Sequence, residues 1–290
     1  LSYNSKTNKY SVYIKTLIID SILSPAINWP EVVKQILPFN PHGTLKESRL
    51  VIKDNKVDYL LTAFNQLGWN AQGDIPQVDN LSGVIEGQPE EGHLEWDSEN
   101  VVINAKDYPK QQISQLNGAL YWKQLNEGLR ISVDRFVLTH PQLTISAQAA
   151  LDQITNKSIG NIRLNMDYAA KDVTQWFKYL PKKHIKSKLY FWLTHQVKKI
   201  DKATGTVKIN GQAKDFPFEK NNGEFSIVSH AVGGSLRINT GWPLATKLEA
   251  YLRLKNRDLD IDLVHGNLKG IPIDQMNLKI ADIGHDKETL

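Results

Sequence analysis

Apolar and polar residues alternate with a period of two over much of the chain. In the first clear example, Leu143, Ile145 and Ala147 are separated by polar or small residues, so they would share one face of a strand. The short sequences Asn-Gly, Gly-Gly, Asn-Asn-Gly and His-Gly-Asn can adopt the positive φ that tight hairpins need, and we expect them to connect the strands. The pattern predicts antiparallel strands with one apolar face, over residues 143–151, 162–168, 207–209, 225–227, 236–238, 248–254, 259–263 and 278–280.

Three segments depart from this period and repeat apolar residues at the spacing of a helix. Trp29, Val32 and Ile36 follow it around Pro30, and Val173, Trp176 and Leu180 follow it behind Asp172. A third stripe begins after Ser187 and runs to Ile200. We therefore predict short amphipathic helices at about 28–37, 172–180 and 187–200, packed on a mainly β structure.

Composition narrows the classes of protein. The 290 residues can form a sizeable core, and a net charge of +4 is too small for a general nucleic-acid binder. The absence of cysteine excludes disulfides and Cys-ligated metals, and it fits an oxidising compartment such as the periplasm. No run of about 18 apolar residues is present. Because the chain begins at Leu1, we expect residues 1–290 to be one continuous segment of a longer protein, with any membrane anchor outside it.

Catalytic motifs are missing from the sequence. It has no GxSxG, HExxH, GxGxxG or P-loop, and its eight histidines are scattered. Two carboxylate groups remain as candidates. Asp258, Asp260 and Asp262 have the spacing of a metal-binding D-x-D, and Glu95 with Asp97 could form a glycosidase pair. Strand alternation explains both groups as solvated faces, so we expect no enzyme activity, no cofactor and no metal.

Lysines are concentrated between Lys178 and Lys202. Eight lysines lie in this range with a single acid, Asp201. Two interpretations stay open. Lys182, Lys183, Lys186 and Lys188 could contact the anionic headgroups of a membrane surface, or they could form an ordinary solvated helix face.

An ordered set of motifs resembles a known family. "DFPFEKNNGEF" (215–225) and the later "GSLRINTGWP" (234–243) are similar to the signature region of YhdP-type members of the AsmA-like superfamily. Upstream, "WFKYLPKKHIKSKLYFWL" is similar to their Leu-Pro helical hairpin, and "IPQVDNLSGVIEG" and "QLNGALYW" are similar to their strand starts. The resemblance covers roughly residues 25–285, and the lysine-rich hairpin departs from it.

This resemblance implies a bridge-like lipid transfer protein of the Gram-negative envelope. Such proteins form an elongated, curled antiparallel β-sheet with an open hydrophobic groove, are anchored in the inner membrane, and carry phospholipids across the periplasm toward the outer membrane. The expected partners are phospholipid acyl chains, the two membranes and envelope proteins. The alternation assigns to the groove Leu143, Ile145, Ala147, Ile162, Leu164, Met166, Val207, Ile209, Phe225, Ile227, Leu236, Ile238, Leu252, Leu254, Leu259, Ile261, Leu263, Leu278 and Ile280.

Physical chemistry supports this expectation separately. An uncovered apolar sheet face is unusual unless it binds something. Exposing the roughly 28 methylenes of a phospholipid to water costs on the order of 20 kcal/mol, which an apolar groove would largely remove. The competing interpretation is a carbohydrate-binding or adhesive β-module whose strands close into a sandwich, and a third is a glycan-active enzyme that uses Glu95 and Asp97.

Overall fold

The computed structural model describes residues 2–4, 9–22, 34, 36–54, 56–156, 158–179, 187–238 and 240–281. The chain forms two compact units. The first comprises residues 1–140 with 152–154, and the second comprises 141–151 with 155–290.

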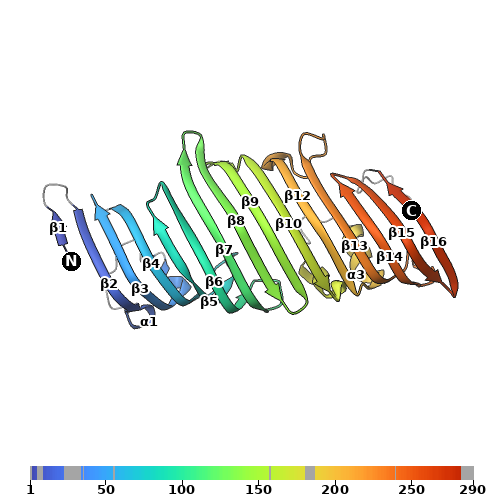
Figure 1. Ribbon diagram of the computed structural model, residues 1–290, viewed down its shortest axis with the longest axis horizontal. Coiled ribbons are helices and arrows are strands. Elements are labelled where there is room, and N and C mark those ends of the chain that lie inside the picture. The colour runs from blue at the N-terminus through green and yellow to red at the C-terminus, as the bar shows by residue number, and fades with distance from the viewer. Residues whose placement is uncertain are drawn as a thin grey trace. The chain divides into compact units, whose positions relative to one another are not determined.

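The first unit is a single layer of antiparallel strands in chain order (Figure 1). Short helical turns, α1 (Ile19–Ile22) and η1 (Leu37–Phe39), interrupt the path between its second and third strands. Val78, Val101 and Ile113 form a small core, and each lies near one end of the strand that carries it. The strands are β1 (Ser2–Asn4), β2 (Lys9–Ile18), β3 (His42–Lys53), β4 (Lys56–Trp69), β5 (Gln77–Gly87), β6 (Glu91–Asn104), β7 (Gln111–Leu125) and β8 (Gly128–His140).

The second unit repeats this arrangement with one helical insertion. Its strands are β9 (Leu143–Ile154), of which the last three residues belong to the first unit, β10 (Asn161–Lys171), β12 (Lys202–Gln212), β13 (Glu224–Leu236), β14 (Ala245–Lys255), β15 (Asp258–Leu268) and β16 (Ile271–Ile280). Between β10 and β12 the chain forms η2 (Val173–Tyr179), α3 (Ser187–His195) and β11 (Val197–Lys199), and η3 (Ala213–Asp215) follows β12.

These observations confirm the predicted fold class. The described strands form open, curled antiparallel sheet with few helices, and within each unit every long strand pairs with its neighbours in the chain. Among the described residues of each unit, no second sheet packs on the layer. The prediction of one continuous segment over residues 1–290 stays a prediction.

Two of the predicted helices are present, with bounds or type that differ from the prediction. Most of 28–37 lies outside the described residues. The segment 172–180 forms the 3₁₀-helix η2 over Val173–Tyr179 rather than an α-helix, and α3 ends at His195 instead of near 200. Helix α3 ends early because the pairing between β12 and β13 stops at Val232, while β13 continues to Leu236. Its final residues need a partner, and Val197 of β11 pairs with Leu236 there.

Most of the sequences expected to form turns lie inside strands, so the prediction that they connect the strands is wrong. Asn210-Gly211 belongs to β12, Gly233-Gly234 to β13, and His265-Gly266-Asn267 to β15. Only Asn221-Asn222-Gly223 lies between strands. The glycines serve other purposes: Gly233, with φ of 73°, forms a bulge in β13, and others lie beneath large side chains.

The motifs taken as strand starts also lie in mid-strand. Gly83 of "NLSG" lies directly opposite Trp96, and Trp96 lies opposite Gly118 of "QLNG". A Cβ atom at Gly118 would overlap the Trp96 ring, and one at Gly83 would lie 2.7 Å from Phe64 Cζ. Both glycines therefore make room for aromatic rings that lie flat against the backbone.

Candidate functional site

Strand register brings many of the predicted residues of the second unit together on one face. Residues directly opposite each other in an antiparallel pair point to the same side of a sheet. One row crosses six strands without a polar side chain, from Met166 through Val207, Ile227, Leu254 and Leu259 to Ile280. We call this side of the second unit, together with the matching rows on either side, the apolar face.

The neighbouring rows extend the apolar face in both directions along the strands. On one side, Leu164 lies opposite Ile209, which lies opposite Phe225. On the other side, the row passes from Tyr168 through Gly205 and Ser229 to Leu252, Ile261 and Leu278.

The remaining predicted residues can also be placed. Ile162 lies opposite Gly211, and Leu263 is buried between Ala250 and Met276. The bulge at Gly233 shifts the alternation by one residue, so Leu236 stays on the apolar face opposite Ala245. Ile238 lies beyond the end of β13 and is exposed, so it is not a strand residue of this face. In β9, half-buried Leu143, Ile145 and Ala147 alternate with exposed neighbours.

Polar residues occupy the opposite side of the same strands. Asp258, Asp260 and Asp262 lie opposite Lys255, Arg253 and Tyr251 on this side. The Arg253 guanidinium, 2.5 Å from Asp262, and a hydrogen bond from Asn277 hold the pKa of Asp262 below its ordinary value. The described residues hold no cluster of His, Cys, Asp and Glu that could bind a metal ion. The D-x-D spacing thus follows from strand alternation and ion pairing, and Glu95 and Asp97 are likewise exposed.

Sequence reasoning missed a comparable face in the first unit. Its central row runs from Ile85 of β5 through Leu94 and Leu120 to Val133. On β4, the other neighbour of β5, Thr62 lies opposite Ile85 and continues the same row. The alternation in "HLEWDSE" is the signal that could have revealed it. Bulges obscure the pattern nearby, because Glu47 and Gln66 both have positive φ where the register shifts.

Most polar side chains within these apolar rows are hydrogen-bonded to each other. Tyr168 Oη donates to Ser229 Oγ at 2.8 Å, and Ser48 and Thr62, both buried, share a hydrogen bond of 2.6 Å. Trp96 is the exception among the described residues, since its Nε1 atom is buried without a hydrogen-bond partner. Because paired hydroxyls need no water, they interrupt the apolar character of these rows very little.

The "DFPF" motif closes one end of the apolar face. Phe218 is 0% exposed, and its ring fills the space that side chains at Gly211 and Gly223 would occupy. The Phe216 ring lies 5.2 Å from that of Phe225, measured between ring centroids, so it continues the apolar face at the strand ends. These contacts explain why glycines stand at positions 211 and 223, on either side of Phe218 in the sequence.

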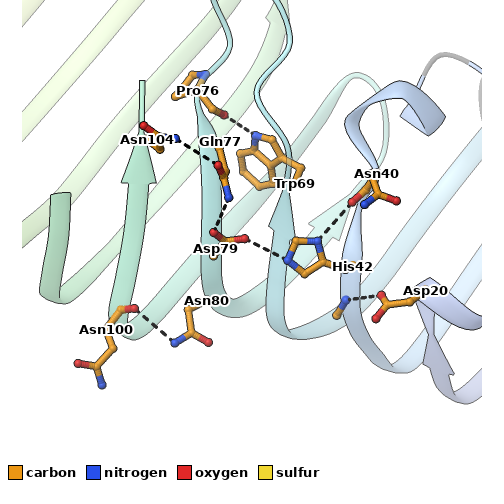
Figure 2. A network of polar contacts seen from close by, with 11 residues as sticks. Asp20, Asn40, His42, Trp69, Pro76, Gln77, Asp79, Asn80, Asn100 and Asn104 are labelled. Carbon is orange, nitrogen blue, oxygen red and sulfur yellow. Dashed lines mark hydrogen bonds and ion pairs between the residues drawn. The ribbon is translucent and has the colours of Figure 1, made fainter. Parts of the chain in front are cut away.

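A polar network joins β3, β5 and β6 near their ends, and no pattern in the sequence predicts it (Figure 2). His42 Nε2 lies 3.0 Å from Asp79 Oδ1, and His42 Nδ1 lies 3.3 Å from the carbonyl of Asn40. Gln77 donates to the other oxygen of Asp79, and Asn104 donates to Gln77. The network therefore holds the ends of these strands together.

The lysines proposed for a membrane surface mostly cannot be placed. Lys182, Lys183 and Lys186 lie outside the described residues, and Lys188 lies in α3 without a described side chain. No helix in the described ranges is long and apolar enough to cross a membrane.

Comparison with known proteins agrees with the motifs. A family model described as "YhdP protein" matches residues 1–290, which confirms the resemblance found in the sequence. No curated protein and no solved structure matches the chain.

Proposed function

Because the chain belongs to the YhdP family, a YhdP-type branch of the AsmA-like lipid transport proteins, we propose that its apolar face carries phospholipid acyl chains between membranes. The transport is non-enzymatic. It takes place in the periplasm, within a protein anchored in the inner membrane, and it supports lipid homeostasis and the permeability barrier of the outer membrane. Phospholipid headgroups remain in water while the chains lie on the face.

One observation carries this proposal: the rows of the apolar face continue from strand to strand, and no described second layer covers them. From Met166 to Ile280, six neighbouring strands contribute an apolar side chain to one row. These side chains are only half-buried by their neighbours. A large uncovered apolar surface is unfavourable in water, and an acyl chain laid on it would gain about 0.8 kcal/mol per buried methylene.

The chemistry of the face suits a passive role. Its hydroxyls at Tyr168 and Ser229 are bonded to each other, so a passing chain would not strip water from an unpaired group. Ionised side chains lie on the other side of the strands, where Arg253 and Asp262 pair. A path of this kind needs no reacting group.

A carbohydrate-binding or adhesive module fits the described structure less well. That alternative expected the strands to close into a sandwich with two facing sheets. Within each unit the described strands instead form one layer that follows chain order. No observation on the described residues favours a sugar site.

Native mass spectrometry of the gently purified protein tests the proposal. We expect charge-state series shifted by the masses of phospholipids, which disappear after detergent exchange and return when phospholipid is added back. Protein that carries no lipid under conditions preserving other lipid complexes, and that binds an oligosaccharide saturably, would overturn the proposal in favour of the carbohydrate-binding module.

A further inference from the structure

The helical insertion and the segment after β13 form one described surface at an end of the second unit. α3 contacts η2 and β11, and Val197 of β11 pairs with Leu236 at the end of β13 (Figure 1). Trp192 Nε1 donates to the carbonyl of Ile238 at 3.0 Å, and the Arg237 amide donates to the carbonyl of Gln196 at 3.0 Å. Gln196 also donates to Thr240. These hydrogen bonds join α3 and Gln196, the residue that follows it, to Arg237, Ile238 and Thr240, so the two segments adjoin each other.

This surface exposes large apolar side chains that face no described partner layer. Phe191 of α3 is 52% exposed, Ile238 is 45% exposed, and Trp242 is 52% exposed. A Cβ atom placed on Gly241 would have no described atom within 4 Å, so the turn that carries the Trp242 indole projects outward. A single exposed apolar residue is ordinary, but three on adjoining segments mark an interaction surface.

The charges around these side chains are nearly all positive. Lys198 and Lys199 are exposed on β11, directly after α3, and Arg237 is exposed directly after β13. Across 187–202 and 237–247 the sequence holds a single acid, Asp201, which pairs with Lys199 at 2.8 Å. Asp172 also acts electrostatically on Lys199, so Lys198 and Arg237 are the cations on which the surface depends. An aromatic surface flanked by Lys198 and Arg237 is complementary to an anionic phospholipid bilayer, where indole rings lie at the headgroup level and basic residues bind the negative surface.

We propose that α3, β11 and residues 237–238 and 240–244 form a docking surface for an anionic phospholipid membrane, which we call the basic aromatic end. This site is separate from the apolar face. The apolar face takes acyl chains along the strands, whereas the basic aromatic end would contact the surface of an intact bilayer. The inference stands on exposure and charge, so it does not depend on the transport proposal.

Vesicle sedimentation tests the docking surface. The protein should sediment with vesicles of phosphatidylcholine that contain phosphatidylglycerol, and far less with phosphatidylcholine alone. Raising the salt from about 0.1 M to about 1 M shortens the Debye length from roughly 10 Å to 3 Å and should release the protein. Equal sedimentation with both vesicles, or with neither, would overturn the proposal.

Matched variants locate the contact. Phe191→Ser combined with Trp242→Ser should weaken binding to anionic vesicles by about tenfold. Ile271→Ser removes an even more exposed apolar side chain from β16, 68% exposed, and should leave binding unchanged. An unaltered affinity in the double variant, or an equal loss in the control, would contradict the assignment.

A charge variant keeps the test decisive if the aromatic variant folds poorly. Each basic residue near an anionic membrane contributes about fivefold in affinity, so Lys198→Glu with Arg237→Glu should cost at least about 25-fold. Lys208→Glu with Lys255→Glu makes the same change on the polar side of β12 and β14 and should cost much less. Both variants should retain phospholipid in native mass spectrometry, which separates a failure of docking from a failure of transport.

Discussion

An aspartate at position 227 would place a charge in the middle of the apolar face. Ile227 lies on β13 between Val207 of β12 and Leu254 of β14. It is half-buried by these neighbours and has no described layer above it. The substitution therefore changes the face without opening a closed core.

The expected effect differs between the empty and the lipid-bound state. In the empty state, Ile227→Asp loses only part of the burial of an isoleucine, about 1 kcal/mol of the free energy of unfolding, because the carboxylate still reaches water. Beneath an acyl chain, the same carboxylate would lose its water at a cost of several kcal/mol. A cost of about 4 kcal/mol corresponds to a loss of about 10³ in lipid affinity.

The adjacent residue supplies a control with the same charge. Ser226 points to the opposite side, between Lys208 and Lys255, and its hydroxyl donates to Glu224 at 2.9 Å. A carboxylate there would gain from the two lysines and lose from the glutamate, each by less than about 1 kcal/mol. Ser226→Asp should therefore be nearly silent for both stability and lipid binding.

Three measurements decide the matter. Thermal unfolding should show both variants folded, native mass spectrometry should show lipid lost only from Ile227→Asp, and complementation of a strain sensitised for outer-membrane permeability should fail only with Ile227→Asp. Normal lipid content and barrier function with Ile227→Asp, or an equal loss with both variants, would refute the assignment of the apolar face as the lipid path.

Further expectations concern stability. Phe218→Ala should lower the free energy of unfolding by about 3–5 kcal/mol in urea titrations because Phe218 is fully buried, whereas Phe216→Ala, 47% exposed at wild type, should cost far less; equal costs would contradict the anchoring role of the motif. Gly118→Ala should lower the free energy of unfolding by about 1–3 kcal/mol through overpacking against the Trp96 ring, and with it the melting temperature. Trp96→Leu in the same protein should restore part of this loss, and additive effects of the two substitutions would refute the contact. The pKa of Asp262 is lowered by its arginine partner on β14, so its contribution to stability is present above the unfolded pKa of about 3.9 and disappears as the pH falls through the lower folded value. The melting temperatures of wild type and Asp262→Asn should accordingly converge in strong acid, and a difference that persists there would contradict the ion-pair explanation.

The face of each strand could be predicted where alternation is unbroken. Phe225 and Ile227 were assigned to one side and Glu224 and Ser226 to the other, and the register places them so. The alternation requires only that each strand be straight, because successive side chains then point to opposite sides. Whether the apolar side binds lipid is a separate question that register does not answer.

Where strands bulge, the sequence alone could not assign a face. Alternation slips over Tyr59–Leu67, and the structure places a left-handed residue, Gln66, at that point. The side chain of glutamine has no strong preference for such a backbone, so the bulge has no clear sequence signal. Ile238 was misplaced for a related reason, because strand length depends on the neighbouring strand rather than on local pattern.

The glycines inside strands connect the stability of the fold with the proposed transport. In a sandwich, the side chains of one sheet are buried by those of a facing sheet. A sheet with one layer has no such partner, yet the Trp96 ring lies over Gly118, the Trp122 ring over Gly92, and the Tyr168 ring close to Gly205. Rings that lie flat bury apolar area against their own sheet, as aromatic residues do when they cover a glycine across a strand pair. They stabilise the layer without rising far above it, so the apolar side can be left open for an acyl chain. A helical or turn-based explanation of these glycines accounts for neither their position in mid-strand nor their aromatic neighbours.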